Sequence, residues 1–417
     1  MIVNPFTSKT FVSIWSDHFN NSKAPISLEF IKHVTFSKHA ILPLYINIGK
    51  NLTKGMNYTL DLNFNDYNRK VVLIYDVPSY FKVQPFIQND SSTLKIKKTY
   101  QYPGYLMDIT GFKDAESYIK SRFSSKNIRD IRSCERRLNE CFKVRYQFYF
   151  GEISQSDYDT VFEYFYELLN TRFFEKNTNY HHLDEKKWTY YKSLVLPMIL
   201  EKKASLLVVY DSDLPIGITL NFHSESILFE TITVFDVNYH KFSIGKISII
   251  RLLEWCFENG YQYSDFSKGD FEYKNKWSNV KYTFDYHILY DSKNFVSTSI
   301  ATGLVAFFNL KAYLRDKKLN NFYRLILHKI KAPFNVHKHY KYAHFKFESL
   351  DNTNFVLADY LKIQIKDKNH SFILKAVYEF LFAHPEPIDS ILVYKHLSNA
   401  KEFVIVGKEI TQRVVFY

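Results

Sequence analysis

The stretch SIGKISIIRLLEWCFENGYQYSDFSKGDFEYKNKW occupies residues 243–277 and decides the fold. Its first part repeats apolar residues with a period of 3.6, which predicts a helix from near Ser243 to just before Gly260. Gly260 is well placed to take the left-handed conformation that ends a helix. YQYSDF then predicts a buried strand ending near Asp265, and Gly269 predicts a tight turn after that strand. The stretch therefore reads as helix, strand and glycine-containing loop.

The residues before this stretch change to the rhythm of strands. Three apolar runs separated by turn residues predict three consecutive strands: ASLLVVYD, LPIGITLNFH and SILFETITVFDVNY. KYTFDYHILY predicts one more strand after the glycine-containing loop. The first hundred residues also alternate short apolar runs with turns, as in AILPLYINIG (40–49), MNYTLDLNF (56–64) and KVVLIYDVP (70–78). Strands and helices mixed in this way indicate an α/β or α+β protein.

The positive charge of the chain is unevenly distributed. The formal net charge is +12. Residues 113–145 hold ten Lys and Arg against five Asp and Glu, and residues 311–346 hold ten against one. Two basic patches on a nearly neutral body favour anionic partners such as phosphates, nucleic acid or a membrane surface. The alternative for each patch is a solvated helix face.

The cysteines and apolar segments indicate a cytoplasmic protein. Cys134, Cys141 and Cys256 show no metal-binding spacing and cannot form an even set of disulfides. The start of the chain lacks the basic and apolar regions of a signal peptide. The most apolar window, Phe295 to Leu310, is shorter than the roughly 20 residues that span a bilayer.

The first turn of the predicted helix, Ile244-Gly245-Lys246, could bind an anion. The first backbone N–H groups of a helix lack partners, and the helix dipole is positive at this end. Gly245 would allow a phosphate close to the backbone, and Lys246 would add a charge. One glycine at such a turn is also compatible with an ordinary helix start.

Several motifs together resemble one family, the CelD/BcsL-type acetyltransferases of the GNAT superfamily, which are distantly related to the FemABX aminoacyltransferases. DFSKGDFEYKNKW (265–277) resembles the family's D-F-G-R-G-x-x-x-Y-K-x-x-W, with Ser267 and Lys268 in place of Gly-Arg. SIGKISI stands where the family has a Ser-Pro-Gly-like turn, with Ile244 in place of the proline. The resemblance runs from about Trp15 to Tyr290 and is strongest over 113–290.

Three further segments support the resemblance. SSKNIRDIRSCERRLNE resembles the family's basic helix, and LLVVYDSDLPIGITLNF resembles its hairpin with a Pro-Ile-Gly turn. Arg172, in ELLNTRFF, matches an arginine that is usual in the next helix. The resemblance implies a GNAT fold of two tandem halves with a small C-terminal extension. The expected divisions are 1–112, 113–295 as the catalytic half, a basic helical segment at 296–344 and an accessory module at 345–417.

The resemblance also implies acyl-CoA as co-substrate. Its pyrophosphate would lie on Ser243, Ile244, Gly245 and Lys246, and the strand after the helix would splay away to admit the pantetheine arm. Asp265 is the expected base or acceptor-orienting carboxylate, and Lys274 would neutralise oxyanion or phosphate charge. The alternative is that Asp265 and Lys274 pair only to hold the loop. Glu230, in LFETITVF, is a further candidate base, although most such glutamates merely face solvent.

Substrate contacts are expected from basic and aromatic side chains. Arg129 and Arg132, with Arg136, lie along one side of the basic helix and could hold an acceptor phosphate or uronate. Arg172 and Tyr273 are expected at the acceptor, which by family analogy is a sugar, nucleotide-sugar or polysaccharide precursor. No metal site is expected, because the histidines lack carboxylate or cysteine neighbours at ligand spacing.

Two other functions stay open at this point. An aminoacyl-tRNA-dependent transferase, as among FemABX enzymes, would recruit the basic patches to RNA, although nucleic acid is not the favoured partner. A non-catalytic protein could keep the fold and bind an anionic membrane or polymer through residues 311–346.

Overall fold

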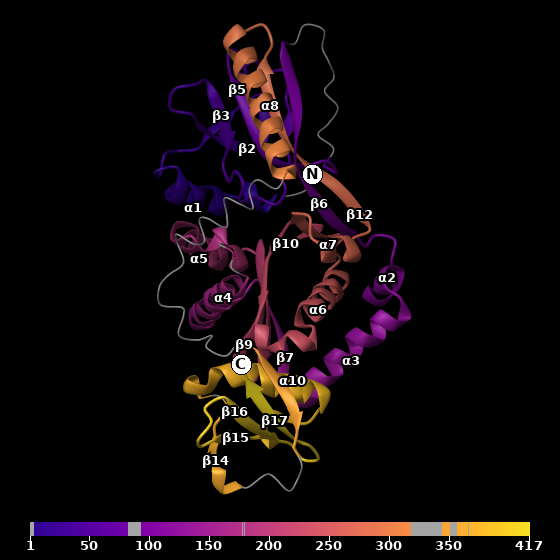
Figure 1. Cartoon of the computed structure of the whole chain (residues 1–417). Helices are drawn as coiled ribbons and strands as arrows, with labels where there is room; N and C mark the ends of the chain where they lie inside the picture. The colour runs from indigo at the N-terminus through magenta and orange to yellow at the C-terminus, as the bar shows by residue number, and fades with distance from the viewer. Residues whose placement is uncertain are drawn as a thin grey trace.

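The computed structural model describes residues 4–81, 93–176, 178, 180–317, 344–350, 357–365 and 367–417. Within these residues, one large mixed sheet with helices on both faces forms the body, and a smaller sheet forms a C-terminal module below it (Figure 1). The expectation of an α/β fold is confirmed.

The large sheet contains twelve strands within the described residues. They are β1 (Ile26–Leu28), β2 (Ile31–Lys38), β3 (Leu44–Asn47), β4 (Thr59–Leu60), β5 (Val71–Pro78), β6 (Leu94–Asp108), β7 (Val144–Tyr149), β8 (Ala204–Asp211), β9 (Leu214–His223), β10 (Ile227–Phe235), β11 (Tyr263–Lys268) and β12 (Val280–Asp291). The helices are α1 (Lys9–Phe19), α2 (Ala115–Arg122), α3 (Ser125–Cys141), α4 (Gln155–Glu175), α5 (Glu185–Leu200), α6 (Ile244–Glu258), α7 (Glu272–Trp277) and α8 (Phe295–Asp316).

The strand order shows an internal repeat. The order is β1-β2-β3-β5-β12-β6-β11-β10-β9-β8-β7, with β4 on β2. Outward from the central antiparallel pair β12–β6, both directions meet an antiparallel, a parallel and two further antiparallel pairings. On the β6 side, the antiparallel pair β8–β7 adds one more. The expected two GNAT-like halves therefore form one continuous sheet. The two halves also exchange strands. β6 from the N-terminal half pairs with β11, and β12 from the C-terminal half pairs with β5.

The decisive stretch forms largely as the sequence predicts. Helix α6 ends before Gly260, which has φ +72°. β11 follows, and Gly269 has φ +111° in the turn beyond it. The stretch after the turn was expected as a loop, but Glu272–Trp277 forms the short helix α7. Trp277 is buried against α2 and α6 and gives this turn of helix its apolar anchor.

Two hydrophobic cores enclose the sheet in the catalytic half. On one face, α4 and α5 bury aromatic and aliphatic side chains such as Phe165 and Leu194 against β8, β9 and β10. On the other face, α6 buries Leu252, Leu253 and Cys256 with α2. These two layers fix the positions of β10 and α6, between which the candidate site lies.

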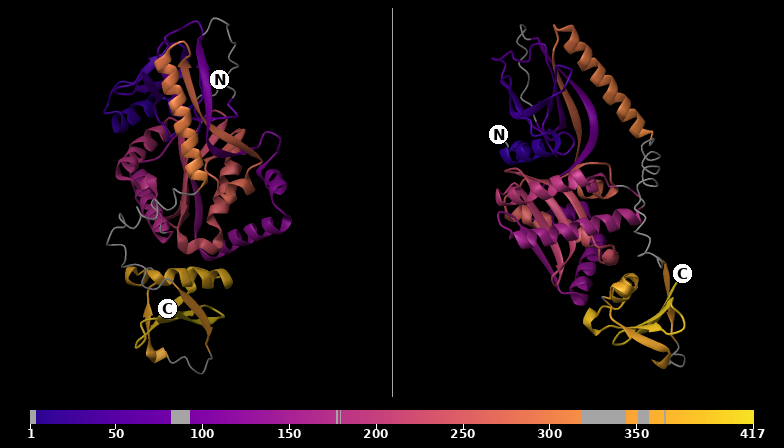
Figure 2. Two further views of the ribbon diagram at one scale, coloured as in Figure 1. Left: turned by 45° about the horizontal axis from the view of Figure 1, so that its top comes forward. Right: turned by 90° about the vertical axis from the view of Figure 1, so that its left-hand side faces the viewer.

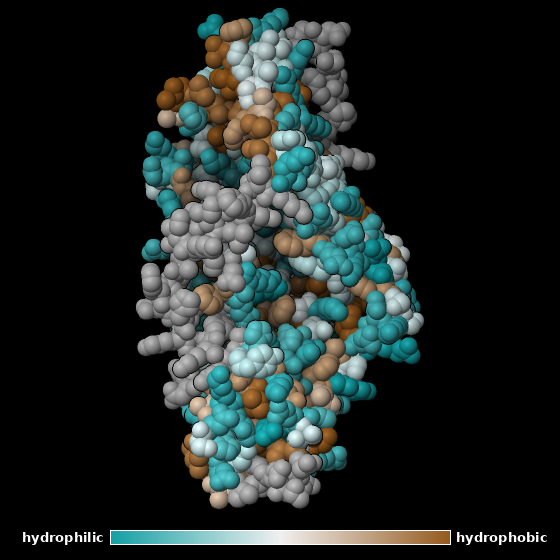
Figure 3. Space-filling model, in the orientation of Figure 1, coloured by the Kyte–Doolittle hydropathy of each residue, from teal (hydrophilic) through white to brown (hydrophobic). Residues whose placement is uncertain are grey.

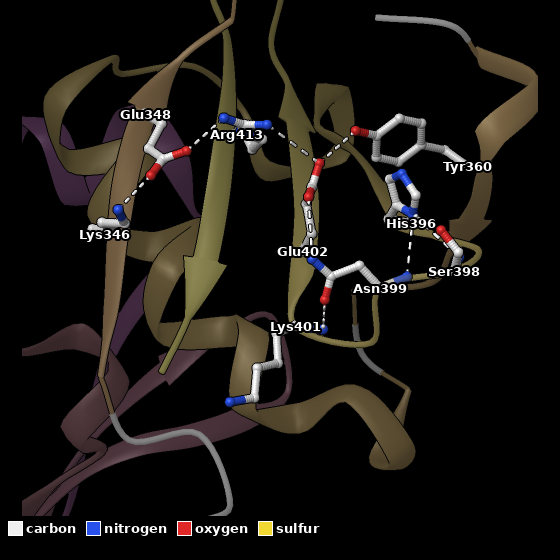
Figure 4. Close-up of polar contacts among 9 residues, drawn as sticks. All are labelled: Lys346, Glu348, Tyr360, His396, Ser398, Asn399, Lys401, Glu402 and Arg413. Carbon is white, nitrogen blue, oxygen red and sulfur yellow. Dashed lines mark hydrogen bonds and ion pairs between the residues drawn. The ribbon is translucent and has the colours of Figure 1, made fainter.

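The C-terminal module is a five-stranded antiparallel sheet with one helix, α10 (Leu374–Ala383). Its strands are β13 (Phe345–Ser349), β14 (Tyr360–Ile363), β15 (Leu392–His396), β16 (Glu402–Val406) and β17 (Thr411–Phe416). Figure 4 shows a polar network on this sheet, in which Arg413 bridges Glu348 and Glu402. Tyr360 donates to Glu402 at 2.7 Å. The network joins β13, β16 and β17.

Helix α10 attaches the module to the catalytic half. It packs on α3 and on the 3₁₀ segment η3 (Val237–Phe242), where the rings of Phe242 and Phe382 lie 5.3 Å apart. Most of the expected basic segment 296–344 cannot be compared, because residues 318–343 lie outside the described residues. Its first part is α8, which covers β12 and β6.

Candidate active site

The site lies where two parallel strands separate. β10 and β11 pair at Ile227–Tyr263, Leu228–Ser264 and Phe229–Asp265, and the pairing then stops. β10 continues along β9, while β11 continues along β6. The predicted splaying of the strand after the helix is therefore confirmed.

The separation exposes backbone groups on β10. The register of β10 against β9 shifts between Glu230 and Ile232, which makes Thr231 a bulged residue. Beyond Phe229, the edge of β10 that faces β11 has no strand partner within the described residues. Unpaired backbone N–H and C=O groups at such an edge can pair with an extended ligand.

Glu230 is the first residue of β10 beyond the last pair. It is buried, and its Oε1 accepts a hydrogen bond from Ser264 Oγ at 3.3 Å. Its Oε2 accepts no hydrogen bond in the described part of the chain. Burial raises the pKa of Glu230 to about 8, against the opposing effects of Lys274 and Ser264. This carboxyl is therefore poised to gain or lose a proton near neutral pH.

Asp265, at the last pair of β11, is fully buried and fully hydrogen-bonded. Its carboxylate accepts bonds from Tyr282 Oη at 2.7 Å, from Tyr80 Oη at 2.8 Å and from the Ser267 backbone N–H at 2.7 Å. Burial raises its pKa to about 6, although the same hydrogen bonds oppose the rise. Its oxygens are occupied by donors, so it fixes the two tyrosine hydroxyls in place.

Lys274, on α7, lies over the end of β11. Its Nζ donates to the carbonyls of Phe266 and Lys268, both at 2.7 Å. Burial lowers its pKa to about 8, and the charges of Asp265 and Glu230 oppose the fall. Lys274 holds the loop through these carbonyls, and no ion pair joins it to Asp265 within the described residues. Asp265 and Lys274 therefore do not pair directly, because other donors occupy the carboxylate and loop carbonyls occupy the ammonium.

The N-terminal half supplies residues that the sequence reasoning missed. Asp76 on β5 is fully buried and forms an ion pair with Lys268 at 2.6 Å. It also accepts hydrogen bonds from Gln101 and Thr53, both at 2.7 Å. The sequence did contain one sign of this role: Asp76 lies inside the apolar run KVVLIYDVP. A buried carboxylate needs partners from elsewhere in the fold.

Lys54 is a second contribution of the N-terminal half. Burial lowers its pKa to about 7, helped by the charges of Lys268 and Lys274 and opposed by Asp76 and Asp265. Within the described residues, no hydrogen bond or ion pair engages its ammonium group. Lys54 therefore adds an unpaired amine to the neighbouring ionisable side chains, which we call the charged cluster: Asp76, Glu230, Asp265, Lys268 and Lys274.

Arg172 and Tyr273 lie together on another side of the cluster. The Arg172 guanidinium lies 4.6 Å from the centre of the Phe235 ring. Its one hydrogen bond within the described residues is a long one, 3.5 Å, to the Thr233 carbonyl. Burial raises the pKa of Tyr273, with the charge of Glu230 adding to the rise and Arg172 opposing it. Arg172 keeps donors available for an anionic group.

The start of α6 faces the end of β10. Ser243 has φ +58° and caps no N–H with its side chain, while its carbonyl accepts from the Lys246 and Ile247 N–H groups. A Cβ added to Gly245 would lie 2.9 Å from the Phe235 ring. Ile244 is buried and Lys246 is exposed. Gly245 is thus required first by the packing of Phe235.

Arg129 and Arg132 are not part of this cluster. Both lie on the exposed side of α3, and Arg132 forms an ion pair with Glu116 at 3.1 Å. Arg132 and Arg136 line an open groove of about 520 Å³ between α3 and α6. The groove's other lining residues are Glu135, Asn139, Glu140 and Arg251. Within the described part of the chain, no group of three or more His, Cys, Asp or Glu could hold a metal ion.

Comparison with known proteins supports part of these expectations. Residues 125–275 match a family model described as an acetyltransferase (GNAT) domain. No curated protein matches the chain. The model's description does not separate CelD/BcsL-type enzymes from other GNAT proteins.

Several solved structures are similar at low identity. FemX is 11% identical, with 61% of this chain and 83% of that chain covered and a TM-score of 0.45. A conserved protein of unknown function from Bacteroides thetaiotaomicron is 9% identical, with 69% and 91% covered and a TM-score of 0.44. A tandem GNAT protein from the clavulanic acid biosynthesis pathway is 7% identical, with 69% and 97% covered and a TM-score of 0.31. At these values the similarity says nothing about substrates.

The matched range ends within the charged cluster and contains Glu230, Asp265 and Lys274, the start of α6 and the separated strands. Residues 125–275 therefore match a GNAT acetyltransferase domain within a mixed α/β fold, and this match supports an acyl-CoA-dependent acyltransferase.

Proposed function

We propose that the protein transfers an acetyl or longer acyl group from acyl-CoA to an amine or hydroxyl of a sugar, nucleotide-sugar or polysaccharide precursor, in the manner of CelD/BcsL-type enzymes. The observation that carries the proposal is the meeting of three features: separated β10 and β11, the glycine turn of α6, and a buried group of ionisable side chains at the point of separation.

Glu230 is the general base in this proposal. It has a free carboxylate oxygen and a pKa near the working pH, which suits proton abstraction from an amine or hydroxyl. Once Glu230 has taken the acceptor's proton, the acceptor forms a bond to the acyl carbon, the thioester C–S bond breaks, and the leaving thiolate takes up the proton from Glu230, which restores the base. Asp265 orients Tyr80 and Tyr282 rather than serving as base, because donors occupy both of its oxygens.

Lys274 supplies positive charge in the same step. Its ammonium lies close enough to Glu230 and Asp265 for their charges to affect its pKa, so it lies near the reacting atoms. A fixed ammonium in a buried site stabilises an oxyanion more strongly than water does. Its bonds to the Phe266 and Lys268 carbonyls fix its position in advance.

The start of α6 fits the pyrophosphate of acyl-CoA. Ser243, Ile244 and Gly245 offer the first backbone N–H groups at this end of the helix, and Lys246, whose own N–H donates to the Ser243 carbonyl, offers an exposed ammonium. Anions are stabilised at such a helix end. The unpaired edge of β10 continues from this turn toward Glu230, which suits the extended pantetheine arm.

Arg172, Tyr273 and Lys54 are the proposed acceptor contacts. Arg172 has unused donors, Tyr273 lies beside it, and Lys54 adds an unpaired amine from the N-terminal half. Arg172, together with Lys54 when it is protonated, favours an acceptor with a phosphate or carboxylate. Arg129 and Arg132 remain a proposed second contact for a longer acceptor, reached along the α3 face.

Calorimetric titration with acetyl-CoA and longer acyl-CoAs tests the proposal. We expect one acyl-CoA site per chain. Replacing Lys246 by Ala should weaken acyl-CoA binding. Release of free CoA thiol with amino sugars and nucleotide sugars then identifies the acceptor class. A well-folded protein that binds no acyl-CoA would contradict the proposal.

The outcome also separates the two other functions. Tight, strongly salt-dependent binding of tRNA without affinity for CoA would indicate aminoacyl-tRNA-dependent transfer. An unchanged cellular phenotype in the double variant Asp265→Asn and Lys274→Ala would indicate a non-catalytic protein.

A further inference from the structure

Helix α8 presents two different faces. Its inner face packs on the sheet through Ala301 and Phe308, and the Phe308 ring stacks on Tyr286 at 3.8 Å. The helix lies on the outside of the N-terminal half (Figure 2). It is the one helix of the described residues that is long and apolar enough to cross a membrane, and 17% of its most apolar window is buried. Most of an apolar helix is thus exposed.

The outer side of α8 carries exposed apolar side chains, most of them toward the end of the helix. Val296, Phe307, Leu310 and Leu314 are 52%, 58%, 56% and 37% exposed. At 100° per residue they lie along one side of the helix, with the exposed Gly303 filling the gap between the first two. We call these four residues the α8 apolar face. In Figure 3, hydrophobic residues gather over this end of the molecule. Soluble monomers rarely expose such a stripe without a binding role.

A loop beside α8 enlarges the apolar surface. Ile41 is 88% exposed and Leu42 is 39% exposed, in the turn between β2 and β3. His39 Nδ1 accepts hydrogen bonds from the backbone N–H groups of both, each at 3.2 Å. The next strand residue, Leu44, is buried in the same cluster as Ala301 and Phe308. The turn therefore holds two apolar side chains outward near the helix.

Cations surround the apolar surface. Lys293 precedes α8, Lys311 is exposed within it, and Lys317 follows it. Along the side of the helix, Lys97 Nζ donates to Thr302 Oγ1 at 3.0 Å. The single acid of α8, Asp316, pairs with Arg315 at 3.7 Å. An apolar stripe with basic flanks matches the headgroup region of an anionic bilayer.

We propose that the α8 apolar face docks the protein on an anionic membrane surface, with α8 lying in the plane of the interface. The helix cannot span the bilayer in this fold, because Ala301 and Phe308 hold its inner face on the sheet. A second copy of the chain fits less well, because the flanking lysines of two copies would repel each other. This inference does not rest on the proposed acyl transfer.

The docked helix is connected to the charged cluster. Arg315, near the end of α8, donates to the Gln101 carbonyl, and Gln101 Nε2 donates to Asp76. Asp76 in turn pairs with Lys268. A short chain of hydrogen bonds therefore connects α8, the membrane-docking helix, to the candidate active site.

Flotation of the full chain with vesicles tests the proposal. We compare phosphatidylcholine vesicles with and without about one third phosphatidylglycerol, since anionic lipid should attract the flanking lysines. We expect binding to the anionic vesicles that weakens as salt is added. The double variant F307E and L310E should lower partitioning by about tenfold or more, because it removes apolar area and adds like charge.

The matched control replaces two leucines of the C-terminal module, L361E and L397E, which are 58% and 65% exposed. This control should bind vesicles as the wild type does. Thermal melting checks folding, and the milder F307S and L310S variant should give the same direction of change. Equal binding by wild type and F307E/L310E, or no binding to either vesicle, would overturn the proposal. So would a lipid-independent dimer that the same substitutions dissociate.

Discussion

The two halves of the sheet each contain one parallel strand pair, and the two pairs have different chemistry. In the N-terminal half, β3 and β5 pair over three residues, and the Asn47 side chain then accepts from the Tyr75 N–H at 2.9 Å. In the catalytic half, β10 and β11 also pair over three residues. Ser264 Oγ donates to Glu230 across these strands at 3.3 Å, but within the described residues no side chain bonds the backbone of the other strand beyond the last pair. The N-terminal junction is closed, and the catalytic junction is open.

The buried carboxylates at the two junctions, Asp76 and Glu230, also differ in how many partners they have. Asp76, just beyond the N-terminal pair, is neutralised by Lys268 and accepts hydrogen bonds from Gln101 and Thr53. Glu230, just beyond the catalytic pair, has one weak partner and a pKa of about 8. A fully partnered buried charge stabilises a fold, whereas an underpartnered one is a candidate for function. We therefore infer a structural role for Asp76 at the junction of β3 and β5, and a catalytic role for Glu230 at the junction of β10 and β11.

The largest effect is expected from replacing Glu230, which should lower turnover without lowering stability. Glu230→Gln keeps the size and the Ser264 hydrogen bond but cannot take a proton. We expect kcat/KM to fall by about 100-fold to 10,000-fold, the usual contribution of a general base. Acyl-CoA binding should stay within a few-fold and the melting temperature should not fall. Unchanged turnover with the best acceptor would remove Glu230 from the mechanism.

The matched change in the N-terminal half should do the reverse. Asp76→Asn leaves the Lys268 ammonium without its buried counterion, which typically costs about 3–5 kcal/mol. We expect a clear loss of unfolding free energy in a denaturant titration, while turnover of the folded fraction falls far less than in Glu230→Gln. A variant as stable as the wild type but inactive would show that Asp76 belongs to the chemistry.

The pH dependence of turnover sharpens the contrast. Glu230, with a pKa raised to about 8, must be deprotonated, so activity should rise with pH up to that value. Lys274, with a pKa lowered to about 8, must be protonated, so activity should fall above it. Together they predict a narrow bell with its maximum near pH 8. In Lys274→Arg the descending limb should move to higher pH, and a profile flat from pH 6 to about 10 would contradict both roles.

The sequence was sufficient for the elements near the decisive stretch. Helical periodicity, Gly260 and Gly269 located α6, β11 and the turn, because these signals are local. Lys54, Asp76 and Tyr80 could not be assigned, since they reach the site only through the exchange of β6 and β12 between halves. That exchange depends on pairing between residues nearly 200 positions apart, such as Tyr290 and Lys95, which no local pattern encodes.

The structure also changes the interpretation of Gly245. A side chain there would meet the Phe235 ring at 2.9 Å, so Gly245→Val should disturb packing as well as ligand binding. We therefore expect the melting temperature of this variant to fall. A loss of about 1–3 kcal/mol in CoA affinity is still expected, at roughly 1.4 kcal/mol per tenfold change. Melting curves and titration of the same sample separate the two effects.

The smallest effect is expected at Lys246. Lys246→Ala removes one exposed charge and leaves the backbone N–H groups in place. We expect CoA affinity to fall only a few-fold, with less effect at high salt, where the charge is screened. Lys241→Ala, an exposed lysine just upstream, is the control and should leave affinity unchanged. A larger loss at Lys246 than at Gly245 would mean that the side chain rather than the helix end holds the phosphates.

Hydrogen exchange with and without acetyl-CoA tests the central claim most directly, because it reports which backbone amides the ligand covers. We expect new protection in the first turn of α6, at Ile244 and Gly245, and along β10 from Thr231 to Phe235. Residues 44–47 and 71–78, at the closed junction of β3 and β5, should exchange as in the free protein. Protection confined to β3 and β5, or none at α6 and β10 with acetyl-CoA at saturation, would contradict the assignment of the open junction as the active site.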